Sequence, residues 1–318
     1  MSNTSAEEVL YLLSRRRFLA AGAALAATPL MPWKAMALTQ APHTFTQGDF
    51  EVTVITDGEL TLPISVFMPD ATPEEQAEIA KRLGWTPPNA TARANHPILR
   101  KGDDVILVDN GSGSKFQPSA GKLLENLKAA GIEPATVTKV VFTHAHPDHI
   151  WGTTDASGAL LFPNATYYVG ATEWNFWMDP ELINKMPPEM GDFVKGAQRE
   201  LTAVKDKVTM LKPGDDVVTG IRALDTAGHT PGHLSFEVSG GEGLIITADA
   251  STNEVIALEH PEWKFAFDAD PELAIKNRKA LIDRAATDKI KLLGYHWTAP
   301  GVGFAERKDN AYVFVAAS

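Results

Sequence analysis

The chain has 318 residues, with 29 Lys and Arg against 40 Asp and Glu, and it contains no cysteine. Its formal charge of −11 removes the electrostatic attraction on which nucleic-acid binding largely depends, so we expect no nucleic-acid partner. Without cysteine, disulfides, thiolate metal sites and cysteine nucleophiles are excluded, and any bound metal must be held by histidine and carboxylate side chains.

The first 37 residues have the order of an export signal. Ser14-Arg15-Arg16-Arg17-Phe18-Leu19 precedes an apolar run to Met31 that is shorter than the roughly 20 residues needed to span a bilayer. Ala35-Met36-Ala37 then fits a small-x-small cleavage site, and the paired arginines before Phe-Leu resemble a twin-arginine (Tat) signal. We therefore expect residues 1–37 to be a twin-arginine-type signal peptide and residues 38–318 to be a periplasmic domain without a stable membrane anchor. The alternative is an amphipathic helix that stays attached.

Strand and helix patterns alternate along the remaining sequence. Phe50–Thr56 alternates apolar and polar residues and stops at Asp57-Gly58, which predicts a strand, a turn and a partner strand over Leu60–Phe67. The segment from Thr72 to Leu83 begins with an N-cap, a proline at the first helical position and acidic residues, and it is predicted to be a helix. A loop is expected from Trp85 to Ala94.

The same criteria predict the elements of the rest of the chain. A hairpin is expected over His96–Arg100 and Val105–Val108. Further helices are expected over Gly121–Ala130, Ala171–Met178, Asp192–Leu201 and Asp270–Ala286. Further strands are expected over Thr138–Thr143, Ala165–Val169, Val208–Leu211, Ile221–Leu224, Leu234–Val238, Leu244–Thr247, Lys291–Tyr295 and Tyr312–Val315. No linker or repeat divides these elements, so we expect one α/β sandwich domain.

The most specific pattern follows the strand expected at residues 138–143. His144-Ala145-His146-Pro147-Asp148-His149 places three imidazoles and one carboxylate within six residues. His144 and His146 point the same way if the backbone is extended, and Pro147 turns the chain so that the next two side chains can approach from another side. Ligand-type side chains this close indicate a metal site, because they would otherwise desolvate one another at a cost.

Three further polar residues lie at or beyond the ends of predicted strands. His229 lies in the glycine-containing segment Asp225–His233, Asp249 ends the very apolar run that begins at Ile245, and His296 ends the run that begins at Leu292. Open α/β sheets collect their sites at strand ends, so we expect these three side chains to join the first cluster.

The order H-x-H-x-D-H, G-H-T-P-G-H, strand-terminal Asp and late His resembles the metallo-β-lactamase superfamily over nearly all of residues 48–318. The resemblance implies a four-layered αβ/βα sandwich and two divalent metal ions. It implies one ion held by His144, His146 and His229. It implies a second ion held by Asp148, His149 and His296, with Asp249 bridging the two.

Imidazole and carboxylate ligands without thiolate favour Zn²⁺, and Mn²⁺, Co²⁺ and Fe²⁺ are the alternatives. A hydroxide bridging the two ions would be the nucleophile, and its pKa would be lowered to roughly 7. By position, Asp148 or Asp249 would be the catalytic carboxylate that relays a proton to the leaving oxygen.

Other polar residues have supporting roles by the same resemblance. Asp109 matches a buried Asp that would orient a ligand histidine, and the alternative is a turn-capping Asp. Asn110 departs from the threonine that the superfamily more often has there. His233 either supports the centre from behind the ligands or is purely structural. Three histidines outside the motifs are interpreted as ordinary residues: His43, His96 and His260.

Within the superfamily, the sequence resembles the branch that contains methyl parathion hydrolase and lactonase-like enzymes. Asp249 argues against true β-lactamases, which generally lack a carboxylate there. The branch implies aromatic side chains around the leaving group, with Phe116, Trp177 and Phe193 as the counterparts, and the alternative for each is core packing. A possible homodimer is implied by the same resemblance alone.

We therefore expect a metal-dependent hydrolase that opens lactones or cleaves aryl esters or phosphotriesters, in the manner of lactonases and organophosphate hydrolases. The alternatives are a glyoxalase II-like thioesterase and a non-catalytic periplasmic metal-binding protein. Tyr167, Tyr168 and Tyr295 are the candidates for the tyrosine that acyl-homoserine lactonases use near the metals. Whether residues 179–191 form a lid is left open.

Overall fold

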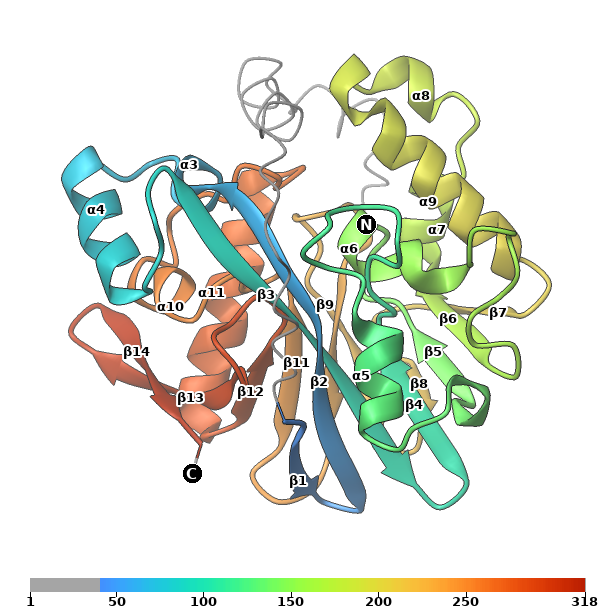
Figure 1. The fold of residues 1–318 in the computed structure, drawn as a ribbon. Coiled ribbons are helices and arrows are strands. Elements are labelled where there is room, and N and C mark those ends of the chain that lie inside the picture. Colours follow the sequence, from blue (N-terminus) through green and yellow to red (C-terminus); the bar gives the residue numbers. More distant parts are fainter. Residues whose placement is uncertain (1–40, 318) are drawn as a thin grey trace.

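A computed structural model describes residues 41–317. The predicted signal peptide, residues 1–37, lies outside the described residues. Two seven-stranded sheets pack against each other, and helices flank them on both sides (Figure 1). This arrangement confirms the predicted α/β sandwich. Within residues 41–317, no helix combines the length and apolarity needed to cross a membrane.

The first sheet contains its strands in sequence order, β1 to β7. They are β1 His43–Gln47, β2 Phe50–Pro63, β3 Asn89–Lys101, β4 Asp104–Val108, β5 Lys139–Val141, β6 Thr166–Gly170 and β7 Val208–Leu211. Strands β1 to β4 pair antiparallel, and β4 to β7 pair parallel. The helices of this half are α3 Ile64–Phe67, α4 Pro73–Arg82, α5 Leu123–Ala129, α6 Pro147–Ile150, α7 Ala171–Trp177, α8 Leu182–Lys185 and α9 Gly191–Val204.

The second sheet has the order β14-β13-β12-β11-β10-β9-β8. Its strands are β8 Asp216–Val218, β9 Ile221–Asp225, β10 Leu234–Val238, β11 Leu244–Ala248, β12 Lys291–Gly294, β13 Val302–Lys308 and β14 Ala311–Ala316. Only β11 and β12 are parallel neighbours. The connection between them carries α10 Ile256–Glu259 and α11 Pro271–Asp288.

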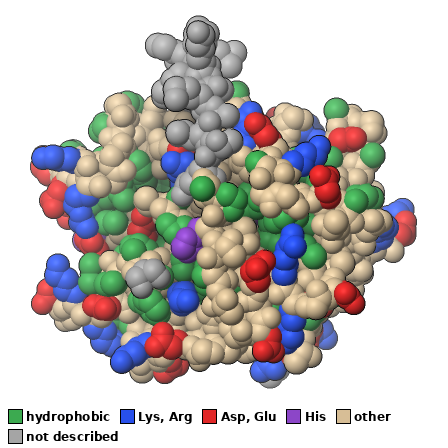
Figure 2. All heavy atoms as spheres, turned by 60° about the horizontal axis from the view of Figure 1, so that its bottom comes forward, with side chains coloured by type: hydrophobic (Ala, Val, Ile, Leu, Met, Phe, Trp, Pro, Cys, Tyr) green, Lys and Arg blue, Asp and Glu red, His purple; other side chains and the backbone are tan. Residues whose placement is uncertain are grey.

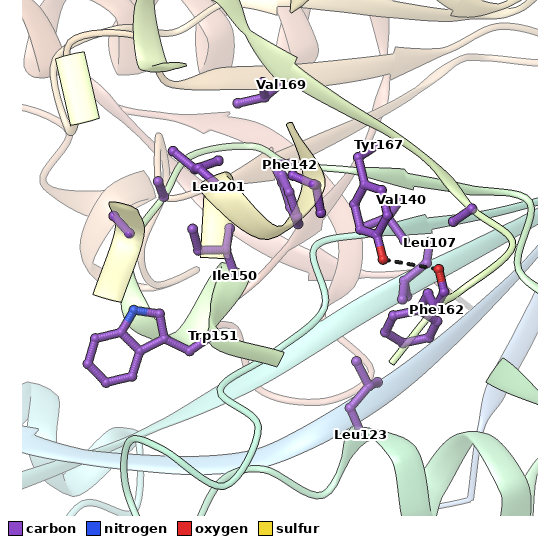
Figure 3. Close-up of a cluster of buried hydrophobic side chains, with 14 of the residues drawn as sticks. Leu107, Leu123, Val140, Phe142, Ile150, Trp151, Phe162, Tyr167, Val169 and Leu201 are labelled. Carbon is purple, nitrogen blue, oxygen red and sulfur yellow. Dashed lines mark hydrogen bonds between the residues drawn. The ribbon is translucent and has the colours of Figure 1, made fainter. Parts of the chain in front are cut away.

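Alternate residues of the first sheet contribute to two different cores. Ile98 and Leu107 face the helices, while Leu99 and Ile106 lie between the sheets with Phe236 of β10. Strand geometry requires this division, because successive side chains point to opposite faces. Figure 3 shows part of the helix-side core, where the buried hydroxyl of Tyr167 donates to the Phe162 carbonyl at 3.0 Å. Burial on both faces explains the continuous apolar runs in these strands.

One predicted turn is wrong. Asp57-Gly58 does not end a strand, because β2 continues to Pro63 with a shift of register against β3. The Asp57 carboxylate instead accepts backbone N–H groups of Ser112, Gly121 and Leu123. Gly58 has φ +113°, and a Cβ there would lie 2.3 Å from a carbonyl oxygen of the same loop. The dipeptide is therefore a bulge against which the 109–123 loop docks.

The errors next to this bulge follow from it. A strand was predicted over Leu60–Phe67, but the observed strand β2 ends at Pro63 and Ile64–Phe67 forms the short helix α3. The predicted loop from Trp85 to Ala94 becomes strand at Asn89, because β3 pairs with the extended β2 as far as Pro63. Strands β1, β8 and β13 were not predicted. The N-cap predicted at Thr72 is confirmed, with a complete capping box to Glu75.

One face of the molecule carries charges of both signs. On the face drawn in Figure 2, acidic and basic side chains are interspersed and no continuous basic area is visible. A polyanion would find no extended attractive surface on this face.

Candidate metal centre

The seven predicted ligand side chains converge at one end of the two sheets. Each is at most 8% exposed. The loop after β5 and the helix α6 carry four of them, and the loops after β9, β11 and β12 carry one each. They are His144, His146, Asp148, His149, His229, Asp249 and His296.

The ligand atoms form two groups. In the first, His146 Nδ1 lies 3.0 Å from His144 Nε2 and 2.9 Å from His229 Nε2. In the second, Asp148 Oδ2 lies 3.3 Å from His149 Nε2 and 3.4 Å from His296 Nε2. All candidate ligand atoms within each group lie within 4.8 Å of one another.

Asp249 lies between the groups. Its Oδ2 is 3.3 Å from His229 Nε2 in the first group and 3.5 Å from His296 Nε2 in the second. Its Oδ1 is 3.5 Å from His149 Nε2. One carboxylate therefore reaches both groups, as the sequence resemblance implied for a bridging ligand.

The donor set fits divalent cations. His149 Nε2 and Asp249 Oδ1 are buried without a hydrogen-bond partner, and leaving such atoms unpaired is costly. Burial and the neighbouring imidazoles lower the pKa of His144 and His146 well below the usual value, which keeps these rings neutral. Neutral imidazole nitrogens and carboxylate oxygens are donor atoms that suit Zn²⁺, which binds four or more ligands.

The carboxylates of the second group attract positive charge. Burial alone would lower the pKa of His149, but Asp148, Asp249 and Asp109 together raise it well above its usual value. Burial raises the pKa of Asp249 less than His296 and His149 lower it, so this carboxylate is strongly acidic. A cation at this place would be stabilised by the same ionised carboxylates.

Three ligand histidines are oriented through their second ring nitrogen. His149 Nδ1 lies 2.8 Å from Asp109 Oδ2, and His229 Nδ1 lies 3.1 Å from Asp268 Oδ1. His296 Nδ1 donates to the Arg93 carbonyl at 2.7 Å. Such contacts turn Nε2 toward the centre as an electron-pair donor.

Asp109 has the position predicted for it. It also accepts the backbone N–H and the hydroxyl of Thr143, each at 2.8 Å. Asp268 was missed by the sequence analysis. Its partners, His229 and Arg278, lie 39 and 10 residues away, so no local motif marks it.

His233 supports the centre without pointing a free nitrogen into it. Its Nε2 accepts the backbone N–H of Asp249 at 3.2 Å, and its Nδ1 lies 2.8 Å from Thr226 Oγ1. Burial lowers the pKa of His233 to about 3, which keeps the ring neutral and able to accept. The contact with the Asp249 backbone favours a supporting role over a purely structural one.

His96 and the candidate tyrosines have structural roles. The Tyr295 hydroxyl donates to the Asp148 carbonyl at 2.7 Å and lies 2.9 Å from His96 Nε2. The fully buried His96 therefore helps to position Asp148 of the second group through Tyr295. Tyr167 donates into the core, and Tyr168 packs between the sheets. None of the three lines the pocket described next.

A pocket of about 380 Å³, open mouth included, lies over the ligands. Its apolar walls are Leu60, Leu62, Phe116, Phe193, Phe265 and Phe267, and its polar lining is His146, Asp148, His229, Asp249 and His296. Phe116 and Phe193 were predicted, whereas Phe265 and Phe267 were missed. Trp177 does not line the pocket, because its ring is buried beside His146 and its Nε1 donates to Glu173 at 2.6 Å. No residue of the segment 179–191 lines it either.

Comparisons with known proteins agree with this geometry. The model of the metallo-beta-lactamase superfamily matches residues 98–294, which is more than half of the chain. N-acyl homoserine lactonase AttM of Agrobacterium fabrum is 34% identical over 195 residues, covering 55% of this chain and 66% of the relative. N-acyl homoserine lactonase AiiA of Bacillus thuringiensis subsp. kurstaki is 29% identical over 171 residues, covering 53% and 59%. The matches span less than two thirds of the length of these relatives.

Two solved structures are similar over most of their length. AidC, described as a dizinc quorum-quenching lactonase in complex with a product, has a TM-score of 0.81 and 26% identity, covering 87% of this chain and 97% of AidC. The hydrolase AbOPH has a TM-score of 0.81 and 29% identity, with the same coverage. The paired His/Asp groups, the two-sheet fold and the matched family model lead to one conclusion: this chain belongs to the metallo-β-lactamase superfamily.

Proposed function

We propose that this chain is a dinuclear-metal-dependent hydrolase that opens lactones. The observation that carries the proposal is the position of the seven-ligand centre at the base of a pocket whose other walls are apolar. A lactone carries one polar ester group and an otherwise apolar body, and these match the two parts of the pocket. The names of AttM, AiiA and AidC support this choice of substrate class.

Divalent ions in such a centre supply Lewis acidity toward a carbonyl oxygen and activate water at neutral pH. His144, His146 and His229 would hold one ion. Asp148, His149 and His296 would hold the other, with Asp249 shared. Asp148 and Asp249 both line the pocket, so either carboxylate could take a proton from the attacking water and pass it to the leaving oxygen as the ring opens.

The walls favour neutral substrates. No Lys or Arg among the described residues lines the pocket, so an anionic thioester such as a glutathione conjugate would lack a counter-charge. This counts against the glyoxalase II-like alternative. Burying apolar substrate area against the leucine and phenylalanine walls contributes about 25 cal/mol per Å².

Aryl esters and phosphotriesters are the second candidate class. The observation that favours them is the set of phenylalanine rings around the pocket, which can stack on a flat leaving group: Phe116, Phe193, Phe265 and Phe267. Phosphotriesters are also uncharged, so the apolar walls alone do not separate the two classes.

The test is a comparison of kcat/KM for the zinc-loaded chain on an N-acyl homoserine lactone, an aryl lactone, an aryl ester and methyl parathion. We expect the lactones to lead by about 100-fold, which is about 2.7 kcal/mol of transition-state stabilisation. A lead of this size for the phosphotriester would contradict the lactonase proposal. No turnover of any substrate with two ions bound would favour the non-catalytic metal-binding alternative.

We also propose export by the twin-arginine route, supported by the sequence of residues 14–37. The test is the location of the protein after expression in a bacterium with an intact Tat system. The wild-type chain is expected in the periplasm, shortened after Ala37. The double variant Arg15→Lys, Arg16→Lys is expected to stay in the cytoplasm, and an unprocessed cytoplasmic wild type would contradict the proposal.

A further inference from the structure

A buried carboxylate on α7 joins the two loops that carry the first ligand group. Glu173 is fully buried, and each of its oxygens accepts two hydrogen bonds. Oε1 accepts the Ala145 N–H at 2.9 Å and the Trp177 indole N–H at 2.6 Å. Oε2 accepts the Thr230 hydroxyl at 2.7 Å and the Gly232 N–H at 3.0 Å.

These donors are sequence neighbours of the candidate ligands in the first group. Ala145 lies between His144 and His146, and Thr230 directly follows His229. One side chain therefore fixes the distance between the loops that bring the three nitrogens of the first group together. Charge-assisted hydrogen bonds to a carboxylate are among the strongest in proteins, so the link is stiff.

The backbone packing at the same place is a second, independent observation. A Cβ on Gly232 would lie 2.1 Å from the backbone nitrogen of Glu173 and 2.6 Å from its Cα. The loop after β9 therefore rests directly on the first turn of α7, an approach that only glycine permits. Where this loop enters β10, the Leu234 N–H donates to the carbonyl of Thr143, just after β5, at 3.0 Å.

We propose that Glu173 is a positioning residue for the first metal position, the one formed by His144, His146 and His229. The inference rests on the dinuclear centre of the proposed function. Glu173 makes no hydrogen bond to the ligands of the second position, which are seated by Asp109, the Arg93 carbonyl and Tyr295. Its loss should therefore weaken one position and spare the other.

The chemistry of the four contacts predicts which hydrogen bonds each variant of Glu173 loses. All four partners donate, and only the Thr230 hydroxyl can turn to accept. In Glu173→Gln the amide NH₂ would face Thr230 and Gly232, so the Gly232 bond is lost while the fold is kept. In Glu173→Ala three N–H groups, from Ala145, Trp177 and Gly232, lose their acceptor.

The experiment is a Zn²⁺ titration of the metal-free chain in competition with a chromophoric chelator, which reports both binding constants. For Glu173→Gln we expect one constant to weaken by about 10–100-fold, the usual effect of removing a group that orients ligands, and the other to stay within about 3-fold. Gly232→Ala keeps the Glu173 side chain but pushes the same loop away from α7, and we expect it to weaken the same position.

Glu200→Gln is the matched control. Glu200 is also fully buried and accepts from Thr154, Lys115 and Arg199, but none of these hydrogen bonds involves a loop that carries a candidate ligand. We expect a lower Tm and two unchanged zinc constants for this variant. Two unchanged constants in Glu173→Gln, or an equal loss at both positions, would overturn the inference. Because zinc affinity is the readout, an absence of lactone turnover would contradict the proposed function without bearing on this result.

Discussion

Asp109 and Ala248 both adopt positive φ angles, 55° and 45°, although neither is glycine. Asp109 orients His149, and Ala248 directly precedes Asp249. A left-handed conformation costs an L residue about 1–2 kcal/mol. The backbone is thus strained at the two points where strands β4 and β11 deliver a carboxylate to the centre, and the surrounding contacts must hold it there.

In the proposed dinuclear centre, Asp249 is the carboxylate that lies near both ligand groups. Asp249→Ala removes the carboxylate that reaches both ligand groups, so we expect one of two ions to be lost. We expect kcat/KM to fall by at least about 100-fold, because removing a residue that only orients a ligand already costs about 10–100-fold. Metal analysis together with kinetics checks this.

Asp225→Ala is the matched control, since Asp225 also ends a strand of the second sheet but is exposed. We expect this control to keep both ions. Full occupancy and full rate in Asp249→Ala would show that the carboxylate is not a ligand.

Phe193 is predicted to contact the acyl part of the substrate. It lines the pocket and is half-buried, whereas the equally half-buried Phe176 does not line it. In Phe193→Ala we expect KM for a long-chain lactone to rise about tenfold, because roughly 1.5 kcal/mol of apolar contact is lost. A short-chain lactone should be affected less than threefold. An equal rise of KM in Phe176→Ala would show that the effect comes from a general loosening of the fold and would contradict a contact between Phe193 and the substrate.

At the level of elements, β2 positions the loop that carries Asp109 and Phe116. The Asp57-Gly58 bulge in this strand collects the loop's N–H groups at one carboxylate. A hairpin turn and a bulge share the same Asp-Gly preference, and only the distant loop decides between them. This is why the sequence pattern predicted a turn there.

Asp57 also gives the fold a pH dependence. Burial raises its pKa to about 6, from 3.8, in spite of the three N–H donors. The folded state therefore binds more protons than the unfolded state between about pH 4 and 6, and stability falls as the pH rises through this window. The asparagine in Asp57→Asn cannot titrate. The unfolding free energy of the wild type minus that of the variant should therefore fall by up to about 3 kcal/mol as the pH rises from about 4 to 6.

Urea unfolding of the two metal-free proteins at pH 4 to 7 measures this difference. A difference that is constant or that rises with pH would contradict the raised pKa.

The grouping of the candidate ligands was predictable because each follows a strand by a short distance in the sequence. His144 to His149 form one local motif, Asp249 and His296 end apolar runs, and His229 lies in the glycine-containing segment after β9. Glu173 and Asp268 were not predictable in this way. They act through residues 28 to 59 positions away, so no local pattern distinguishes them from other acidic residues. The same holds for Phe265 and Phe267, which reach the pocket only through the long connection between β11 and β12.

At the scale of the whole molecule, the centre joins the two halves of the sandwich. The first sheet's half supplies four ligands, from His144 to His149, and the second supplies His229, Asp249 and His296. Ions bound here would link the sheets at one end. The homodimer suggested by resemblance stays a prediction.

Removal of metal should therefore lower the stability of the entire domain. A ligand at 1,000 times its Kd stabilises the folded state by about 4 kcal/mol, and for a domain of this size that corresponds to a shift of about 10 °C in Tm. We expect a chelator to lower Tm by this order and added Zn²⁺ to restore it. Asp249→Ala should respond less. A Tm that does not respond to the chelator would mean that no ion bound at the centre stabilises the folded state.

The most direct test of the account is a titration of lactone turnover. The metal-free chain receives increasing Zn²⁺, and the rate on an N-acyl homoserine lactone is measured at each step. We expect no turnover without metal and a rise that ends at two equivalents, because both ligand groups line one pocket. Full turnover without metal, or none with two ions bound, would contradict the account.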